Sequence, residues 1–265
     1  MKKIKLLPLI TTIFFVSWLG VLPSLLIAHG MKLPAFLKNF HILMTLGTLL
    51  VSVIFVWIVQ GRVGLKALFS RLLRIKASPL VFFVVIGLPI IIWLSGTWLG
   101  LTFSNTAWPQ RYTFDHILMQ GVINFVVYLV VNTEEIAWRG VVFDQLLQNN
   151  SYIRACLILA PIWWLFHIPL FMYPGGHPAG YGLVEFTLVV LSQTFILGWI
   201  YIKTNRSVLY VHLNHQLNNG FAEALPVFPV FIGGNLLPFR VTIGISALLA
   251  VVLVLSARRW NKSPQ

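Results

Sequence analysis

Long apolar runs follow one another along the chain, and short polar connections separate them. Since about 20 apolar residues cross the roughly 30 Å hydrocarbon layer of a bilayer, each run predicts one membrane-spanning helix. We place about eight such helices, near residues 4–28, 38–60, 79–101, 115–148, 152–173, 183–203, 207–225 and 239–257. The pattern predicts an all-α, polytopic membrane helical bundle, with residues 1–265 forming a single membrane domain.

The composition agrees with this class. Apolar residues make up 58% of the chain and charged residues 9%, with a mean hydropathy of +0.87, and these values lie far outside the range of soluble globular domains. The formal net charge is +13. Its Lys and Arg residues lie in the short connections, where anionic lipid headgroups attract them. We therefore expect membrane lipids, and not nucleic acid, as the partners of this charge.

The basic residues also predict an orientation. An even number of helices places both termini on one side of the membrane. The basic residues expected on that side are Lys2, Lys3, Lys5, Arg62, Lys66, Arg71, Arg74, Lys76, Lys203, Arg206, Arg258, Arg259 and Lys262, against Lys32, Lys38, Arg111 and Arg240 on the other side. Because Lys and Arg are enriched in cytoplasmic loops, both termini are expected to be cytoplasmic. The first apolar run is long and has no clear cleavage site, so we interpret it as a retained helix of a plasma-membrane protein.

Charged side chains occur at the end of the apolar run 117–131, where a membrane helix would be expected to contain none. Glu135 and Arg139 are four residues apart, so they share a helix face and can form an ion pair. Glu134 points about 100° away from Glu135 and is left without this local partner. Charges within a membrane are costly and mark functional sites by default. The alternative is that both carboxylates only hold helices together, but buried ion pairs are poor stabilisers.

His167 is the expected partner of Glu134. The turn 149–151 joins two predicted helices, and Glu134 precedes it by about as many residues as His167 follows it. In an antiparallel hairpin these equal distances put both side chains at one depth, provided that the helix with the glutamates continues to the turn. The remaining histidines near helix ends or in loops are interpreted as satisfied structural residues: His29, His41, His116 and His177.

A third polar group lies on the helix predicted for 207–225. His212, His215 and Asn219 are spaced three and four residues apart and form one polar stripe. An imidazole and a carboxamide can each donate a hydrogen bond to the oxygen that becomes negative when a carbonyl is attacked. We assign this role to His215 and Asn219 and expect Asn218 to point elsewhere. Interhelical hydrogen bonding is the preferred account of His212 and Asn214.

Together these motifs resemble those of a known family. The elements are Glu134-Glu135-x-x-x-Arg139, Trp163-x-x-x-His167 and His215-x-x-x-Asn219, which are similar to the motifs of the CPBP family of CAAX-processing, Rce1-type intramembrane proteases and their bacteriocin-immunity relatives. The resemblance identifies residues 115–225 as the catalytic core. One departure is Trp163, where the family usually has Phe, and an aromatic packing role is expected to survive it.

The resemblance implies an intramembrane endopeptidase that hydrolyses membrane-associated or CAAX-like peptides. Glu134 would activate a water with help from His167, and Glu135 would pair with Arg139. His215 and Asn219 would stabilise the oxyanion. The implied partner is a peptide or lipid-modified protein substrate, and the compact chain is typical of a prokaryotic plasma-membrane protein.

Three alternatives stay open. Family members have also been described as metalloproteases, and Glu134, His167 and His215 would supply the ligands of a catalytic zinc. The chain has no His-Glu-x-x-His motif, and we prefer hydrolysis without a cofactor. A non-catalytic bacteriocin-immunity or scaffold protein could keep the same residues. A transporter or proton relay would also place polar residues within the membrane, although we find no second copy of the motifs.

Overall fold

The computed structural model describes residues 2–177 and 180–257, which form helices and connecting loops without a β-strand. The main helices are α1 (Leu6–Ala28), α2 (Leu43–Leu72), α3 (Pro79–Phe103), α4 (Phe114–Val131), α5 (Glu134–Ala137), α6 (Asp144–Leu146), α7 (Tyr152–His167), α8 (Leu183–Lys203), α9 (Val208–Ala224) and α10 (Leu237–Ser256). In this part of the chain, seven helices are long and apolar enough to cross a membrane. The predicted polytopic all-α bundle is confirmed.

The number of spans is one lower than the eight expected, because α9 is not among the seven. The helix α9 is only 17 residues long and carries several polar side chains, so it falls outside the seven.

The predicted continuous helix 115–148 is wrong. After α4 ends at Val131, Asn132 adopts an extended conformation with ψ of 97°, and its side-chain Oδ1 accepts a hydrogen bond from the backbone N–H of Glu134 at 3.2 Å. Such Asn side chains compete with the helical backbone hydrogen bonds and interrupt helices.

The segment that follows α5 is a π-helix over Trp138–Phe143, which leads into α6. A π-helical turn holds one more residue than an α-helical turn, and such turns occur often at functional sites. All six of its residues are buried. Glu134 and Glu135 therefore lie on the short helix α5, directly before a π-helical segment that is buried throughout.

The helix α2 continues beyond the expected boundary near residue 60. Gly61 has a positive φ of 63° and kinks the helix, a conformation that glycine adopts without steric cost. The extension ends near Arg71, whose Nη1 lies 2.7 Å from Oδ2 of Asp144. Arg206 also contacts Asp144, at 3.1 Å, and the hydroxyl of Tyr201 donates to it. This polar cluster joins α2, α6 and α8 at one end of the bundle.

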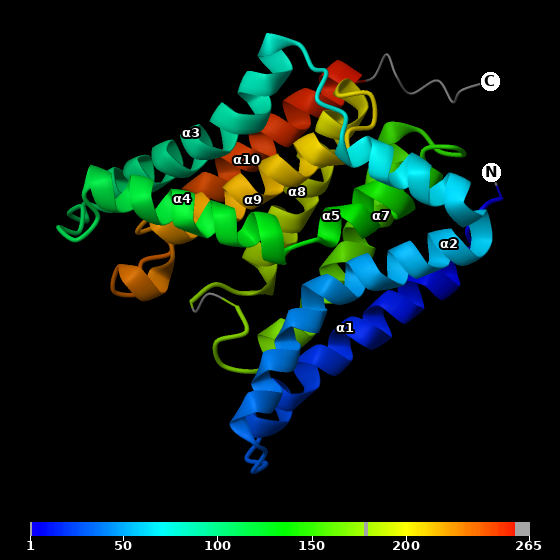
Figure 1. Ribbon diagram of the computed structural model, residues 1–265. Coiled ribbons are helices and arrows are strands. Elements are labelled where there is room, and N and C mark those ends of the chain that lie inside the picture. The colour runs from blue at the N-terminus through cyan, green and yellow to red at the C-terminus, as the bar shows by residue number, and fades with distance from the viewer. Residues whose placement is uncertain (1, 178–179, 258–265) are drawn as a thin grey trace.

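Packing brings helices that are distant in sequence side by side. The helix α4 lies along α9, α10 packs between α3 and α8, and the α1–α2 hairpin lies beside α5 (Figure 1). The crossing of α3 and α10 is close because α3 presents two glycines there. A Cβ on Gly100 would lie 2.2 Å from Cα of Pro238, and a Cβ on Gly96 would lie 2.2 Å from Oγ1 of Thr242. Such small residues let helix backbones approach each other within a membrane.

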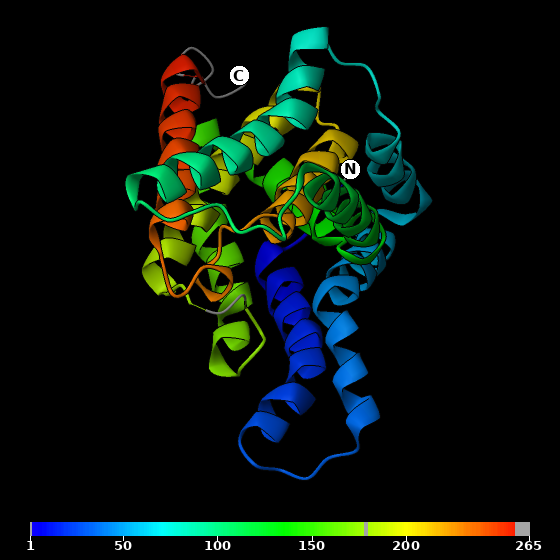
Figure 2. The ribbon, with the colours of Figure 1, turned by 90° about the vertical axis from the view of Figure 1, so that its left-hand side faces the viewer.

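The beginning of α1 and the end of α10 lie toward the same side of the bundle in Figure 1. The turn between α1 and α2 projects from the bottom of the molecule in both views (Figures 1 and 2). Arg258, Arg259 and Lys262, which contributed to the predicted orientation, lie outside the described residues. The cytoplasmic location of the termini stays a prediction.

Candidate active site

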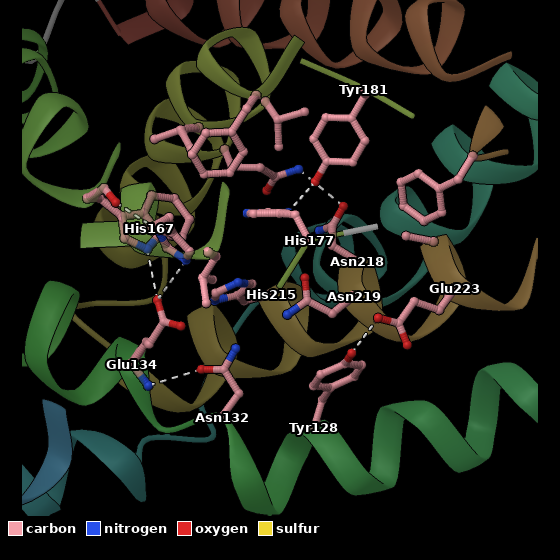
Figure 3. A pocket seen from close by; sticks show the side chains of 18 of the residues that line it. Tyr128, Asn132, Glu134, His167, His177, Tyr181, His215, Asn218, Asn219 and Glu223 are labelled. Atoms are coloured by element: carbon pink, nitrogen blue, oxygen red, sulfur yellow. Dashed lines mark hydrogen bonds and ion pairs between the residues drawn. The ribbon is translucent and has the colours of Figure 1, made fainter. Parts of the chain in front are cut away.

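Three helices bring the polar side chains singled out in the sequence to one cavity of about 280 Å³ (Figure 3). Glu134 comes from α5 and His167 from the end of α7, whereas His215 and Asn219 lie one turn apart on α9. All four side chains line the cavity. Glu135 and Arg139 lie behind this wall and are completely buried.

Glu134 is held through one of its two carboxylate oxygens. Oε2 accepts hydrogen bonds from the indole N–H of Trp163 at 2.9 Å and from that of Trp138 at 3.2 Å. Nε2 of His167 lies 3.8 Å from the same oxygen. Within the described residues Oε1 has no hydrogen-bond partner, although the side chain lines the cavity. The sequence did not reveal the two indole donors, which fix the carboxylate and leave Oε1 available.

The orientation of His167 follows from its own helix. Its Nδ1 lies 2.8 Å from the carbonyl oxygen of Trp163, and because a carbonyl only accepts, Nδ1 carries a proton. In the neutral ring Nε2 is then an acceptor directed toward Glu134. The separation of 3.8 Å between Nε2 and Oε2 exceeds a direct hydrogen bond. A small movement or an intervening water would allow a proton to pass between them.

Glu135 forms the expected pair with Arg139 and also contacts the third helix. Its Oε1 accepts from Nη1 of Arg139 at 2.7 Å and lies 2.8 Å from Nδ1 of His215. The carboxylate therefore fixes the imidazole with Nδ1 toward the protein interior, which leaves Nε2 of His215 for the cavity. The guanidinium carbon of Arg139 also lies 4.4 Å from the ring centre of Trp163. A pair of buried charges thus orients a cavity imidazole.

The side-chain amides of the two neighbouring asparagines of α9 differ in how strongly they are hydrogen-bonded within the protein. Nδ2 of Asn219 has one weak contact, 3.5 Å from Oε1 of Gln216. Asn218 was expected to point elsewhere, but it lines the same cavity. Its Oδ1 accepts from Nε1 of Trp93 and from Nε2 of Gln193, both at 3.1 Å. Asn219 is consequently the amide that remains available to a ligand.

His212 and Asn214 make the interhelical hydrogen bonds expected from the sequence. Nε2 of His212 lies 2.9 Å from the carbonyl oxygen of Leu129 on α4. Nδ2 of Asn214 donates to the carbonyl oxygen of Val85 on α3, also at 2.9 Å. The two side chains attach α9 to its neighbours on both sides.

His177 is a cavity residue that the sequence interpretation missed. Its Nδ1 lies 2.6 Å from the hydroxyl of Tyr181, and its Nε2 is buried without a hydrogen-bond partner in the described chain. Burial, and secondarily the nearby His167, lower the pKa of His177 to about 3. Gly176 and His177 belong to a glycine- and proline-rich loop, which the sequence favours as a plain connector but which lines the cavity.

Tyr128 and Glu223 form the opposite end of the cavity (Figure 3). The hydroxyl of Tyr128 donates to Oε1 of Glu223 at 2.5 Å. This pair joins α4 to α9 and gives the cavity a second acidic group, about which the motifs carried no information.

The geometry of these side chains also bears on the alternative of a zinc site. Across residues 2–177 and 180–257, no three His, Cys, Asp or Glu side chains are placed to hold a metal ion. Glu134, His167 and His215 line one cavity, but they do not form such a group. In this arrangement the three side chains do not fit a zinc ion.

Comparison with known proteins supports the resemblance seen in the motifs. Residues 115–221 match the family model described as type II CAAX prenyl endopeptidase Rce1-like. The chain is also similar to CAAX prenyl protease 2 of Methanococcus maripaludis, with 25% identity over 164 residues. That match covers 59% of this chain and 59% of the relative. The predicted resemblance to the CPBP, Rce1-type family is confirmed, and the segment 115–221 contains all seven residues of the motifs.

Proposed function

We propose that this multi-pass membrane protein, whose residues 115–221 match the Rce1-like endopeptidases, is an intramembrane endopeptidase of membrane-associated or CAAX-like peptides. The observation that carries the proposal is the hydrogen bonding of the Glu134 carboxylate. Two indole N–H groups hold Oε2, while Oε1 has no partner within the described residues and the side chain lines a cavity. A carboxylate fixed in this way is suited to accept a proton from water.

The proposed reaction begins with a water bound at Oε1 of Glu134. Glu134 takes one proton from the water, and the oxygen forms a bond to the carbonyl carbon of the scissile peptide. The carbonyl oxygen becomes an oxyanion. In the second step the carbon–nitrogen bond breaks, and the departing nitrogen receives the proton from Glu134 by way of Nε2 of His167. One water is consumed, and a carboxylic acid and an amine are formed.

The oxyanion would be stabilised from α9. Asn219 donates from its amide, and His215 donates from Nε2 when its ring is protonated, with Nδ1 held by Glu135. Donors that are already in position need little reorganisation when the charge develops, and one such donor contributes about 10²–10³ in rate. Glu135 and Arg139 act as positioning residues, because neither lines the cavity.

The proposed reaction needs no metal or other cofactor. Within the described residues, Glu134, His167 and His215 do not form a group that could hold a metal ion, which supports this choice over zinc. The substrate would be a peptide or a lipid-modified protein that reaches the cavity within the plasma membrane.

The decisive experiment compares the wild-type protein with Glu134→Gln in liposomes, using a panel of membrane peptides. We expect the variant to lose about 10²–10⁴ in kcat, the range attributed to a general base. Glu185→Gln is the matched control, because Glu185 pairs with Arg240 away from the cavity, and it should keep wild-type activity. Full activity of Glu134→Gln contradicts the proposal. A wild type that cleaves none of the peptides would favour the immunity or scaffold role.

A further inference from the structure

The cavity of the candidate active site reaches only one end of the bundle. Beyond the four polar residues, its wall includes Gly176, His177, Tyr181, Phe228 and Phe239, which belong to the loops after α7 and α9 and to the start of α10. None of the described residues in the connections at the opposite end, such as 73–78, 147–151 and 204–207, lines it. The site is therefore closed toward the end where α1 begins and α10 ends.

A second cavity continues from the first at the open end. It has a volume of about 760 Å³, and we call it the vestibule. Its lining includes the polar side chains of Arg111, His116, Gln120 and Asn124. The two cavities share Tyr128, Gly176, His177, Glu223 and Phe228. The vestibule thus meets the active-site cavity at the Tyr128–Glu223 pair and at the loop that carries His177.

The basic residues relate this open end to the sides of the membrane. The end with the vestibule has Lys32, Lys38, Arg111 and Arg240, whereas the closed end has Lys2, Lys3, Lys5, Arg62, Lys66, Arg71, Arg74, Lys76, Arg154, Lys203 and Arg206. Lys and Arg are enriched on the cytoplasmic side of membrane proteins. The closed end is accordingly the cytoplasmic end.

We propose that substrate and water reach Glu134 through the vestibule from the extracytoplasmic side, and that the substrate is a peptide segment exposed on that side. The class of substrate rests on the proposed endopeptidase function, whereas the side of entry does not. The vestibule offers amide, imidazole and guanidinium groups, which can bind the donors and acceptors of an extended peptide backbone. Nε2 of Gln120 donates to Oδ1 of Asn124 at 2.7 Å, so these amides form a polar strip along α4.

The side of entry can be tested without any assay of activity. Cys156 is fully buried, and it is the one cysteine of the sequence, so the wild-type chain gives the unlabelled baseline. Gln120→Cys places a thiol in the vestibule, and Lys66→Cys places one on the exposed α2 extension at the closed end. In intact cells, a membrane-impermeant maleimide should label Gln120→Cys, and it should label Lys66→Cys only after permeabilisation. The reverse pattern overturns the proposal.

The substrate class is tested with sealed membrane vesicles of both orientations. An impermeant, unlipidated peptide should be cleaved by right-side-out vesicles and by inverted vesicles only after detergent is added. Cleavage confined to intact inverted vesicles contradicts the inference. An absence of cleavage with every peptide even in detergent refutes the endopeptidase function, while the maleimide labelling still reports the side of entry.

Discussion

Replacing Trp163 by Phe tests whether the indole donor positions the carboxylate of Glu134. The change removes the hydrogen bond of 2.9 Å between Nε1 and Oε2 and keeps an aromatic ring beside Arg139, whose guanidinium carbon lies 4.4 Å from the ring centre. It also converts this position to the residue that the related proteases usually have. The second donor, Trp138, stays in place at 3.2 Å.

The size of the effect follows from the strength of the lost bond. Hydrogen bonds to charged groups contribute about 1.5–3 kcal/mol, and about 1.4 kcal/mol corresponds to a tenfold change in rate. If the indole bond is needed to aim Oε1 at the water, kcat should fall by about 10- to 100-fold. The loss should stay below that of Glu134→Gln because Trp138 still holds the carboxylate.

The assay measures kcat and KM of the purified protein with one cleaved peptide. Trp164→Phe is the matched control, because the indole N–H of Trp164 is buried and has no partner in the described chain. That variant should keep wild-type kcat. A Trp163→Phe variant with undiminished kcat, or a Trp164→Phe variant with an equal loss, would refute the positioning role of the indole.

Further predictions concern stability, pH and metal. Glu135→Gln leaves the buried charge of Arg139 without its counterion, so the free energy of unfolding in detergent should fall by about 3–5 kcal/mol; an unchanged unfolding curve contradicts this. His177 is neutral in the fold, with its pKa lowered to about 3, so the unfolded chain binds a proton more readily below its ordinary pKa of about 6.5. The stability that His177 contributes is thus present above this pH and is lost as the pH falls toward 3. The Tm of His177→Gln should accordingly fall less than that of the wild type between neutral and acidic pH, and parallel curves would contradict this account. Gly100→Ala should lower the free energy of unfolding by about 1–3 kcal/mol through crowding at the crossing of α3 and α10. A Tm equal to that of the wild type would contradict this, because it would mean that the two helices move apart without cost. Dialysis against a chelator should leave activity unchanged, and one bound zinc per chain together with loss of activity on chelation would restore the metalloprotease alternative.

The membrane bundle and the meeting of the polar helices could be predicted because both depend on simple periodicities. Apolar length gave the spans within a few residues except at α2, which runs on to Leu72, and at the predicted helix 115–148, which is interrupted after Val131. The four-residue spacing of Glu135 and Arg139 gave their ion pair. Equal distances from the turn at 149–151 placed Glu134 and His167 at one depth, as their contact of 3.8 Å shows.

Other features could not be predicted because they depend on tertiary contacts. The apolar pattern does not distinguish an α-helix from the π-helical segment, and it predicted no interruption at Asn132. Trp163 was expected only to pack as an aromatic ring and Trp138 was assigned no role, although their N–H groups hold Glu134. His177 was interpreted as a satisfied structural residue, because the local sequence does not place its side chain at the cavity that it lines.

The π-helical segment between the glutamates and α6 constrains the length of the chain as well as its residues. Glu134 and Glu135 precede it, and Asp144, which bonds Arg71 and Tyr201, follows it directly. Removing one residue from this stretch would turn Asp144 by about 100° relative to the glutamates. Glu134 could then no longer face the cavity while Asp144 pairs with Arg71 of α2. Among homologues, a single-residue gap between positions 138 and 143 should therefore coincide with the loss of one of them.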